Sequence, residues 1–164
     1  SPTLRVYWTD DRSGVEIGGA VKNVLAIAAG VVIGRGFGEN ARAALLTRGL
    51  AELAGFGHAM GARTETLMGL SGLGDLMLTA LSATSRNTRF GMALGEGRPV
   101  RAALDQLGVV EGYWTAPVVD RLARRLGVST PVVHAVTAIL ESRLTVEEAF
   151  ASLMRRPLKA EGLP

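Results

Sequence analysis

The chain has 164 residues, of which 48% are hydrophobic and 20% charged, and this balance excludes a disordered protein. It contains no cysteine, which excludes disulfides and thiolate metal sites. The net charge of +3 suits a small phosphorylated ligand as well as a nucleic acid, but the basic residues are scattered and no basic stripe with interleaved aromatics appears. We therefore expect no nucleic-acid partner.

The first elements are a short segment and a long apolar helix. Residues 4–9 have the composition of a strand, and 10–13 carry helix-start residues. A helix is predicted over 13–33, although glycines interrupt it at 14, 18, 19 and 30. Such glycines are tolerable where another helix or a ligand approaches the backbone closely. The uncharged run 23–34 is shorter than the ~20 residues of a membrane span, so we expect a buried helix and no span.

The rest of the chain is typical of short, closely connected helices. Helical spacing of apolar residues, glycine stops, Thr130-Pro131 and a Thr145–Glu148 capping box delimit them. The predicted helices cover 39–60, 64–70, 73–81, 86–94, 100–107, 112–126, and stretches that begin at Pro131 and after Thr145. The predicted fold class is all-α.

Three polar features stand out against this apolar background. Lys22 lies in the middle of the most hydrophobic helix, where a lysine reaches solvent, finds a partner or faces a polar cavity. Asp75 follows Gly72-Leu73-Gly74 and reads either as a helix N-terminal carboxylate or as a group that accepts a substrate hydroxyl or orients Lys22. Taken alone, these two residues leave both the structural and the functional interpretation open.

The third feature is Ser85-Arg86-Asn87 at a predicted helix start. Free backbone N–H groups, a hydroxyl and a guanidinium would together form a phosphate site, although an ordinary Ser N-cap beside an exposed Arg has the same sequence.

His58 and His134 are on separate predicted helices without a metal-ligand pattern, so we expect no metal site and a structural or surface role for both.

Five segments in order resemble bacterial-type NAD(P)-dependent glycerol-3-phosphate dehydrogenase. They are Val15–Val24, Gly69–Leu76, Thr84–Asn87, Val109–Gly112 and Arg156–Lys159. The resemblance extends over nearly the whole chain, and it implies the all-helical C-terminal domain of that family, related to the C-terminal domain of 6-phosphogluconate dehydrogenase.

The resemblance also implies a reaction and a set of residues. Dihydroxyacetone phosphate and sn-glycerol 3-phosphate would be interconverted with NAD or NADP as cofactor, a step that supplies phospholipid synthesis in the cytoplasm. Lys22 matches the family's general acid/base, and Asp75, Ser85, Arg86 and Asn87 match substrate-binding positions. The cofactor-binding positions correspond to Arg86, Val109 and Glu111.

Complete members of that family begin with a Rossmann domain, and its glycine-rich dinucleotide loop is not found here. On this interpretation residues 1–9 are a remnant of the interdomain junction, 10–164 form the helical domain, and the chain is inactive alone. Two alternatives stay open: a helical dimerisation or interaction module, and a related dehydrogenase domain that acts on another small phosphate or acid. Apolar surface at the missing domain's place also makes a homodimer an expectation.

Overall fold

A computed structural model describes residues 6–155, and within them every regular element is a helix. The predicted all-α class is confirmed. The Arg156–Lys159 motif and residues 1–5 lie outside the described part. The elements are α1 (Arg12–Gly34), α2 (Glu39–Ala59), α3 (Thr64–Leu67), the π-helical turn η1 (Leu70–Gly74), α4 (Asp75–Leu81), α5 (Arg86–Gly95), α6 (Val100–Leu107), α7 (Glu111–Arg125), α8 (Pro131–Leu140) and α9 (Val146–Met154).

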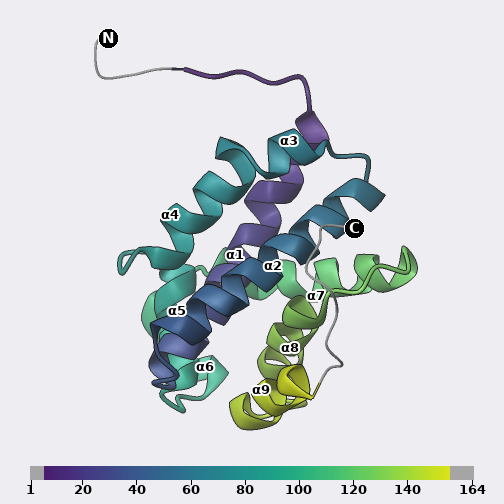
Figure 1. Ribbon diagram of the computed structural model, residues 1–164. Helices are drawn as coiled ribbons and strands as arrows, with labels where there is room; N and C mark the ends of the chain where they lie inside the picture. Colours follow the sequence, from purple (N-terminus) through teal and green to yellow (C-terminus); the bar gives the residue numbers. More distant parts are fainter. Residues whose placement is uncertain (1–5, 156–164) are drawn as a thin grey trace.

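Helix α1 is the central helix of the fold, as Figure 1 shows. It packs against α2, α4, α5, α7 and α8, and Val24, Leu25 and Ile27 in its second half are fully buried. A helix that is apolar on all sides needs such complete cover. By length and composition alone α1 could also cross a membrane, but most of its apolar stretch is buried among the other helices.

Helices α1 and α5 touch through their backbones. A Cβ atom at Gly30 of α1 would overlap the carbonyl oxygen of Thr88, and one at Gly91 of α5 would overlap that of Ile27. Gly34 and Gly95 make the same kind of contact one turn further along. The helix-destabilising glycines therefore serve close helix packing, one of the two reasons that the sequence offered for them.

Helix ends follow the predicted capping chemistry. Asp11 caps α1 by accepting from the Gly14 N–H at 2.9 Å, and its other oxygen accepts from the Arg63 N–H at 2.8 Å. The Thr145–Glu148 capping box is present at α9. Gly61 and Gly127 follow α2 and α7 with φ of +83° and +69°, the left-handed conformation of a helix C-terminus.

The start of α8 is capped from a distance and not by its own Thr130, whose side chain makes no capping bond. The buried carboxylate of Glu52 on α2 accepts instead from the N–H of Val132, at 2.8 and 3.0 Å, and of Val133 at 3.3 Å. A carboxylate is favoured at the positive end of a helix dipole. Glu52 thus holds α2 and α8 together.

Two local predictions were wrong. Residues 6–9 form no strand, because the part of the chain that the structure describes holds no strand with which they could pair. Their side chains are exposed. The expected break at Ser71-Gly72 is instead the π-helical turn η1, which continues directly into α4. The role of the first residues as an interdomain junction stays a prediction.

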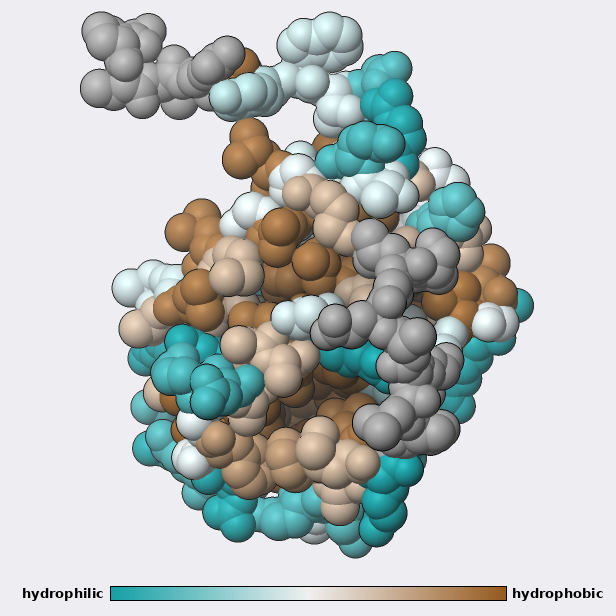
Figure 2. Space-filling view, in the orientation of Figure 1, coloured by the Kyte–Doolittle hydropathy of each residue, from teal (hydrophilic) through white to brown (hydrophobic). Residues whose placement is uncertain are grey.

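Apolar side chains remain exposed along η1 and α4. Leu70, Met77, Leu78 and Leu81 have 65, 40, 72 and 46% of their surface exposed. Figure 2 shows apolar side chains along the flank that α4 forms. A surface of this kind is typical of a protein–protein contact.

The α1–α5 contact predicts the effect of adding single methyl groups. Gly91→Ala should lower the free energy of unfolding by about 3 kcal/mol or more, because the methyl group forces the two backbones apart. Gly19→Ala on α1 is the matched control, since its Cβ would meet no atom within 4 Å and the change should be neutral or stabilising by up to about 1 kcal/mol. Urea titration measures both, and equal effects would contradict the close contact.

Removal of the distant cap should destabilise the fold. Glu52→Ala leaves the Val132 and Val133 N–H groups without their acceptor, and we expect a loss of about 2–3 kcal/mol in urea titration. Glu148→Ala removes the exposed carboxylate that accepts from the Thr145 N–H and hydroxyl in the capping box of α9, and it should cost only about 1 kcal/mol. A smaller loss for Glu52→Ala than for Glu148→Ala would show that the buried cap is dispensable.

The cap of α1 predicts a pH dependence of stability. Hydrogen bonds from the backbone N–H of Arg63 and of Gly14 lower the pKa of Asp11. Because the pKa is lower in the folded than in the unfolded state, the stabilisation is present above the unfolded value of about 3.9 and is lost as pH falls through the folded value. Asp11→Asn should therefore lower Tm at pH 7 and match wild type in strong acid. A difference in Tm that stays constant with pH would contradict this assignment.

Candidate active site

Lys22 and Asp75 form an ion pair where the middle of α1 meets the start of α4. The Lys22 Nζ donates to Asp75 Oδ2, and 20 and 34% of the two side chains are exposed. Of the options that the sequence left open, Lys22 has found a partner, and Asp75 both begins a helix and orients the lysine. A half-buried ammonium held by one carboxylate can still present a proton to a ligand from the open side.

The backbone of η1 fixes this pair. A Cβ at Gly18, one turn before Lys22, would lie 2.6 Å from the carbonyl oxygen of Ser71, so η1 packs directly on α1. Asp75 follows η1 and is thereby set beside Lys22. Of the two reasons that the sequence offered for a glycine at 18, close approach of protein backbone applies and room for a ligand does not, because η1 fills that space. Gly19, by contrast, has no atom within 4 Å of its Cβ position.

Asn23, the residue next to Lys22, joins α1 to α5 and α7. Its Nδ2 donates to Glu111 Oε2 at 2.9 Å, and its Oδ1 accepts from Asn87 Nδ2 at 2.9 Å. Asn87 Oδ1 in turn accepts from the Gly112 N–H at 2.9 Å. These contacts hold Asn87 and Glu111 against Asn23, the residue that follows Lys22 in the chain. Sequence reasoning missed Asn23 itself, for which a buried amide in an apolar helix was the available signal.

Ser85 and Arg86 stand at the start of α5. Ser85 is an N-cap, since its Oγ accepts from the Thr88 N–H at 3.3 Å, as the structural interpretation of the motif predicted. Arg86 is exposed, and its guanidinium makes no hydrogen bond or ion pair with any other residue in the range 6–155. A guanidinium beside the positive end of a helix dipole favours an anion.

Of the three expected cofactor positions, Arg86 is the first residue of α5 and the other two lie at the start of α7. Val109 is 65% exposed, and Glu111, also exposed, is the first residue of the helix. Gly112 allows this end of α7 to approach α1, because a Cβ there would lie 2.7 Å from the Asn23 carbonyl oxygen. Exposed side chains of α5 and α7 therefore border the same region of α1 that carries Lys22.

The two histidines lie apart from the Lys22–Asp75 pair. His58 is exposed near the end of α2, while His134 Nδ1 on α8 lies 2.8 Å from the guanidinium of Arg124 and 3.3 Å from the carboxylate of Asp120. Among residues 6–155, no group of three or more histidine, aspartate and glutamate side chains could hold a metal ion.

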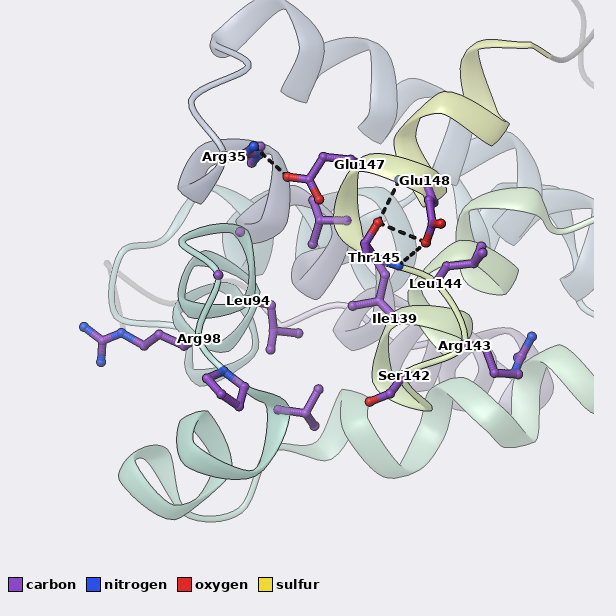
Figure 3. Close-up of a pocket in the computed structure, with 15 residues that line it drawn as sticks. Arg35, Leu94, Arg98, Ile139, Ser142, Arg143, Leu144, Thr145, Glu147 and Glu148 are labelled. Carbon is purple, nitrogen blue, oxygen red and sulfur yellow. Dashed lines mark hydrogen bonds and ion pairs between the residues drawn. The ribbon is translucent and has the colours of Figure 1, made fainter.

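A separate pocket of about 430 Å³ opens at the far end of α1. Figure 3 shows Leu94 and Ile139 at its walls, and an Arg35–Glu147 ion pair of 2.6 Å at its edge. Arg35 follows Lys22 by 13 positions, about 20 Å along a helix, and none of the predicted site residues lines this pocket. The pocket therefore lies apart from the Lys22–Asp75 pair.

Comparisons with known proteins agree on one family. Residues 11–151 match the family described as "NAD-dependent glycerol-3-phosphate dehydrogenase C-terminus". Glycerol-3-phosphate dehydrogenase [NAD(P)+] of Novosphingobium aromaticivorans is 56% identical over 98% of this chain and 49% of its own length. That of Brucella ovis is 54% identical over 98% of this chain and 48% of its own length. The chain thus spans about half the length of these curated relatives.

Solved structures give the same result. The crystal structure of glycerol-3-phosphate dehydrogenase from Coxiella burnetii superposes with a TM-score of 0.89 at 45% identity, over 93% of this chain and 47% of that one. A glycerol-3-phosphate dehydrogenase from Plasmodium falciparum superposes with a TM-score of 0.84 over 98% of this chain and 47% of its own. At 17% identity this second likeness shows the fold alone.

Proposed function

The chain belongs to the family of NAD-dependent glycerol-3-phosphate dehydrogenase C-terminal domains, and from this premise we propose that it forms the substrate-binding, proton-transferring half of such an enzyme. The reaction is the interconversion of dihydroxyacetone phosphate and sn-glycerol 3-phosphate with NAD(P)H. The observation that carries the proposal is the Lys22–Asp75 ion pair, which holds an ammonium group half-buried beside exposed anion-binding and cofactor positions.

Lys22 is the general acid/base. In the direction of reduction its Nζ–H gives a proton to the carbonyl oxygen of the ketone as the carbonyl carbon is reduced; in the reverse direction the neutral amine takes the hydroxyl proton. Asp75 orients the ammonium and keeps it from turning to solvent.

The phosphate group is bound at the start of α5. Arg86 supplies the charge, since its guanidinium is exposed and can pair with two phosphate oxygens at once. The Ser85 hydroxyl oxygen accepts the capping hydrogen bond from the Thr88 N–H, and its O–H can still donate to a ligand. The amide of Asn87 donates one N–H to Asn23 and has a second for the ligand.

NAD or NADP is held from this side by Arg86, Val109 and Glu111. The fit rests on their exposure: an apolar side chain, a carboxylate and a guanidinium lie open to a ligand with apolar, hydroxyl and phosphate parts. When bound, the nicotinamide supplies the hydride for the reduction. The choice between NAD and NADP lies with residues of the nucleotide-binding part of the enzyme.

The wider role follows from the reaction. Curated relatives are about twice as long, and we propose that turnover requires a nucleotide-binding domain in addition to these helices. The product would supply phospholipid synthesis in the cytoplasm.

A homodimer belongs to the same proposal. The apolar side chains exposed on α4 support a contact with another protein surface.

Removal of the Lys22 side chain should abolish most of the activity. In the protein at its full natural length, Lys22→Ala should lower kcat for dihydroxyacetone-phosphate-dependent NAD(P)H oxidation by about 10²- to 10⁴-fold, because the proton donor is lost. Absorbance at the reduced nicotinamide band measures the rate.

Arg101→Ala is the matched control, since it removes a cation whose side chain is 88% exposed on α6, and its rate should equal that of wild type. A folded Lys22→Ala protein that retains the wild-type rate would remove Lys22 from the mechanism. A folded full-length wild type without any activity would overturn the proposed reaction and favour the interaction module or another small phosphate as substrate.

A further inference from the structure

Four polar groups next to Lys22 form a closed ring that ties α1, α5 and α7 together. The Gly112 N–H donates to Asn87 Oδ1, Asn87 Nδ2 donates to Asn23 Oδ1, and Asn23 Nδ2 donates to Glu111 Oε2, with each bond 2.9 Å long. The peptide bond between Glu111 and Gly112 closes the ring. The two asparagines lie on different helices and both are more than nine-tenths buried.

The direction of the hydrogen bonds in the ring is fixed by its two ends. A backbone N–H can only donate, so Asn87 must turn its carbonyl oxygen to Gly112 and its amide nitrogen to Asn23. A carboxylate can only accept, so Asn23 must turn its amide nitrogen to Glu111. Neither asparagine can flip without facing donor to donor or acceptor to acceptor. The ring has one arrangement, in which each bond polarises the next.

Asn23 has no spare donor. Its second N–H donates to the carbonyl oxygen of Gly19 at 3.2 Å, and only 6% of the residue is exposed. It therefore cannot be a ligand-contacting residue like its neighbour Lys22. Its contacts instead lead to two side chains with different proposed partners: Asn87, on the substrate side, and Glu111, on the cofactor side.

We propose that Asn23 is a positioning residue that couples the two ligands. A cofactor that engages the free oxygen of Glu111 holds this carboxylate in the position where it accepts from Asn23. Asn23 then holds the Asn87 amide with its second N–H directed at the substrate phosphate. Binding of either ligand therefore orders the ring and raises the affinity for the other ligand. By thermodynamic linkage, the affinity changes by the same factor in both directions. This inference rests on the proposed function.

The coupling is measured as a ratio of dissociation constants. In the full-length protein, NADH is titrated by its fluorescence with and without saturating sn-glycerol 3-phosphate, and the quotient of the two Kd values is the coupling factor. For wild type we expect a factor of about 5 or more, within the usual range for coupled sites. Asn23→Ala, which opens the ring, should bring it below about 2.

Two further variants separate coupling from stability. Asn23→Asp keeps the size of the side chain and still accepts from Asn87, but it cannot donate to Glu111. It should therefore lose the coupling as Asn23→Ala does, while it retains two of the three hydrogen bonds of the ring. Thr88→Val is the matched control: it removes another buried hydrogen bond of α5, from Thr88 Oγ1 to the Thr79 carbonyl oxygen, and should keep the wild-type factor.

The outcomes are distinct. A coupling factor near 1 in active wild type, or an unchanged factor in Asn23→Asp, overturns the role of Asn23 and leaves the proposed function standing. An equal loss in Thr88→Val also overturns it, because general loosening of α5 would then explain the effect. A folded wild type that neither binds NADH nor turns over dihydroxyacetone phosphate overturns the proposed function, and the coupling with it.

Discussion

Backbone contact between α1 and α5 sets the geometry of everything else in this domain. Gly30 of α1 and Gly91 of α5 each lie directly against a backbone carbonyl oxygen of the other helix, and no side chain larger than hydrogen fits there. The helix axes are therefore much closer than side-chain packing allows. Because α1 is also covered by α2, α4, α7 and α8, its position is determined from all sides, and the polar residues that it carries are held without freedom to shift.

The polar chemistry gathers at one level of this central helix. Lys22 and Asn23 follow one another, yet they point to different neighbours: the lysine to Asp75 at the start of α4, the asparagine to Asn87 on α5 and Glu111 on α7. Three helix N-terminal regions thus converge on two consecutive residues of α1. Each of these helix starts carries the positive end of a helix dipole, and the carboxylates of Asp75 and Glu111 stand at two of them.

Stability and chemistry are supported by different interactions. The Glu52 cap joins α2 to α8, and the pocket at the far end of α1 lies between the ends of α5 and α8 and the starts of α6 and α9. Lys22, Asp75, Asn87 and Glu111 lie instead where the middle of α1 meets the starts of α4, α5 and α7. A buried carboxylate that caps two N–H groups contributes to the fold without being near the proposed substrate. This division explains why the domain can carry a half-buried ion pair at Lys22, where water and a ligand must have access.

The class, most helix boundaries and the candidate residues Lys22, Asp75 and Arg86 could be predicted from the amino-acid sequence. These depend on local chemistry: apolar spacing, glycine stops and capping residues act within a few positions along the chain, and a lysine in an apolar helix is conspicuous wherever the helix packs. The residues that surround them became known from the packing of the helices. The partners of Lys22, Asn87, Asn23 and Val132 lie 53, 64, 88 and 80 positions away, and no local pattern encodes which helix faces which. That is why Ser71 against Gly18, the cap from Glu52 and the ring through Asn23 were beyond sequence reasoning: each arises from the packing of α1 against other helices, which the whole set of helices decides together.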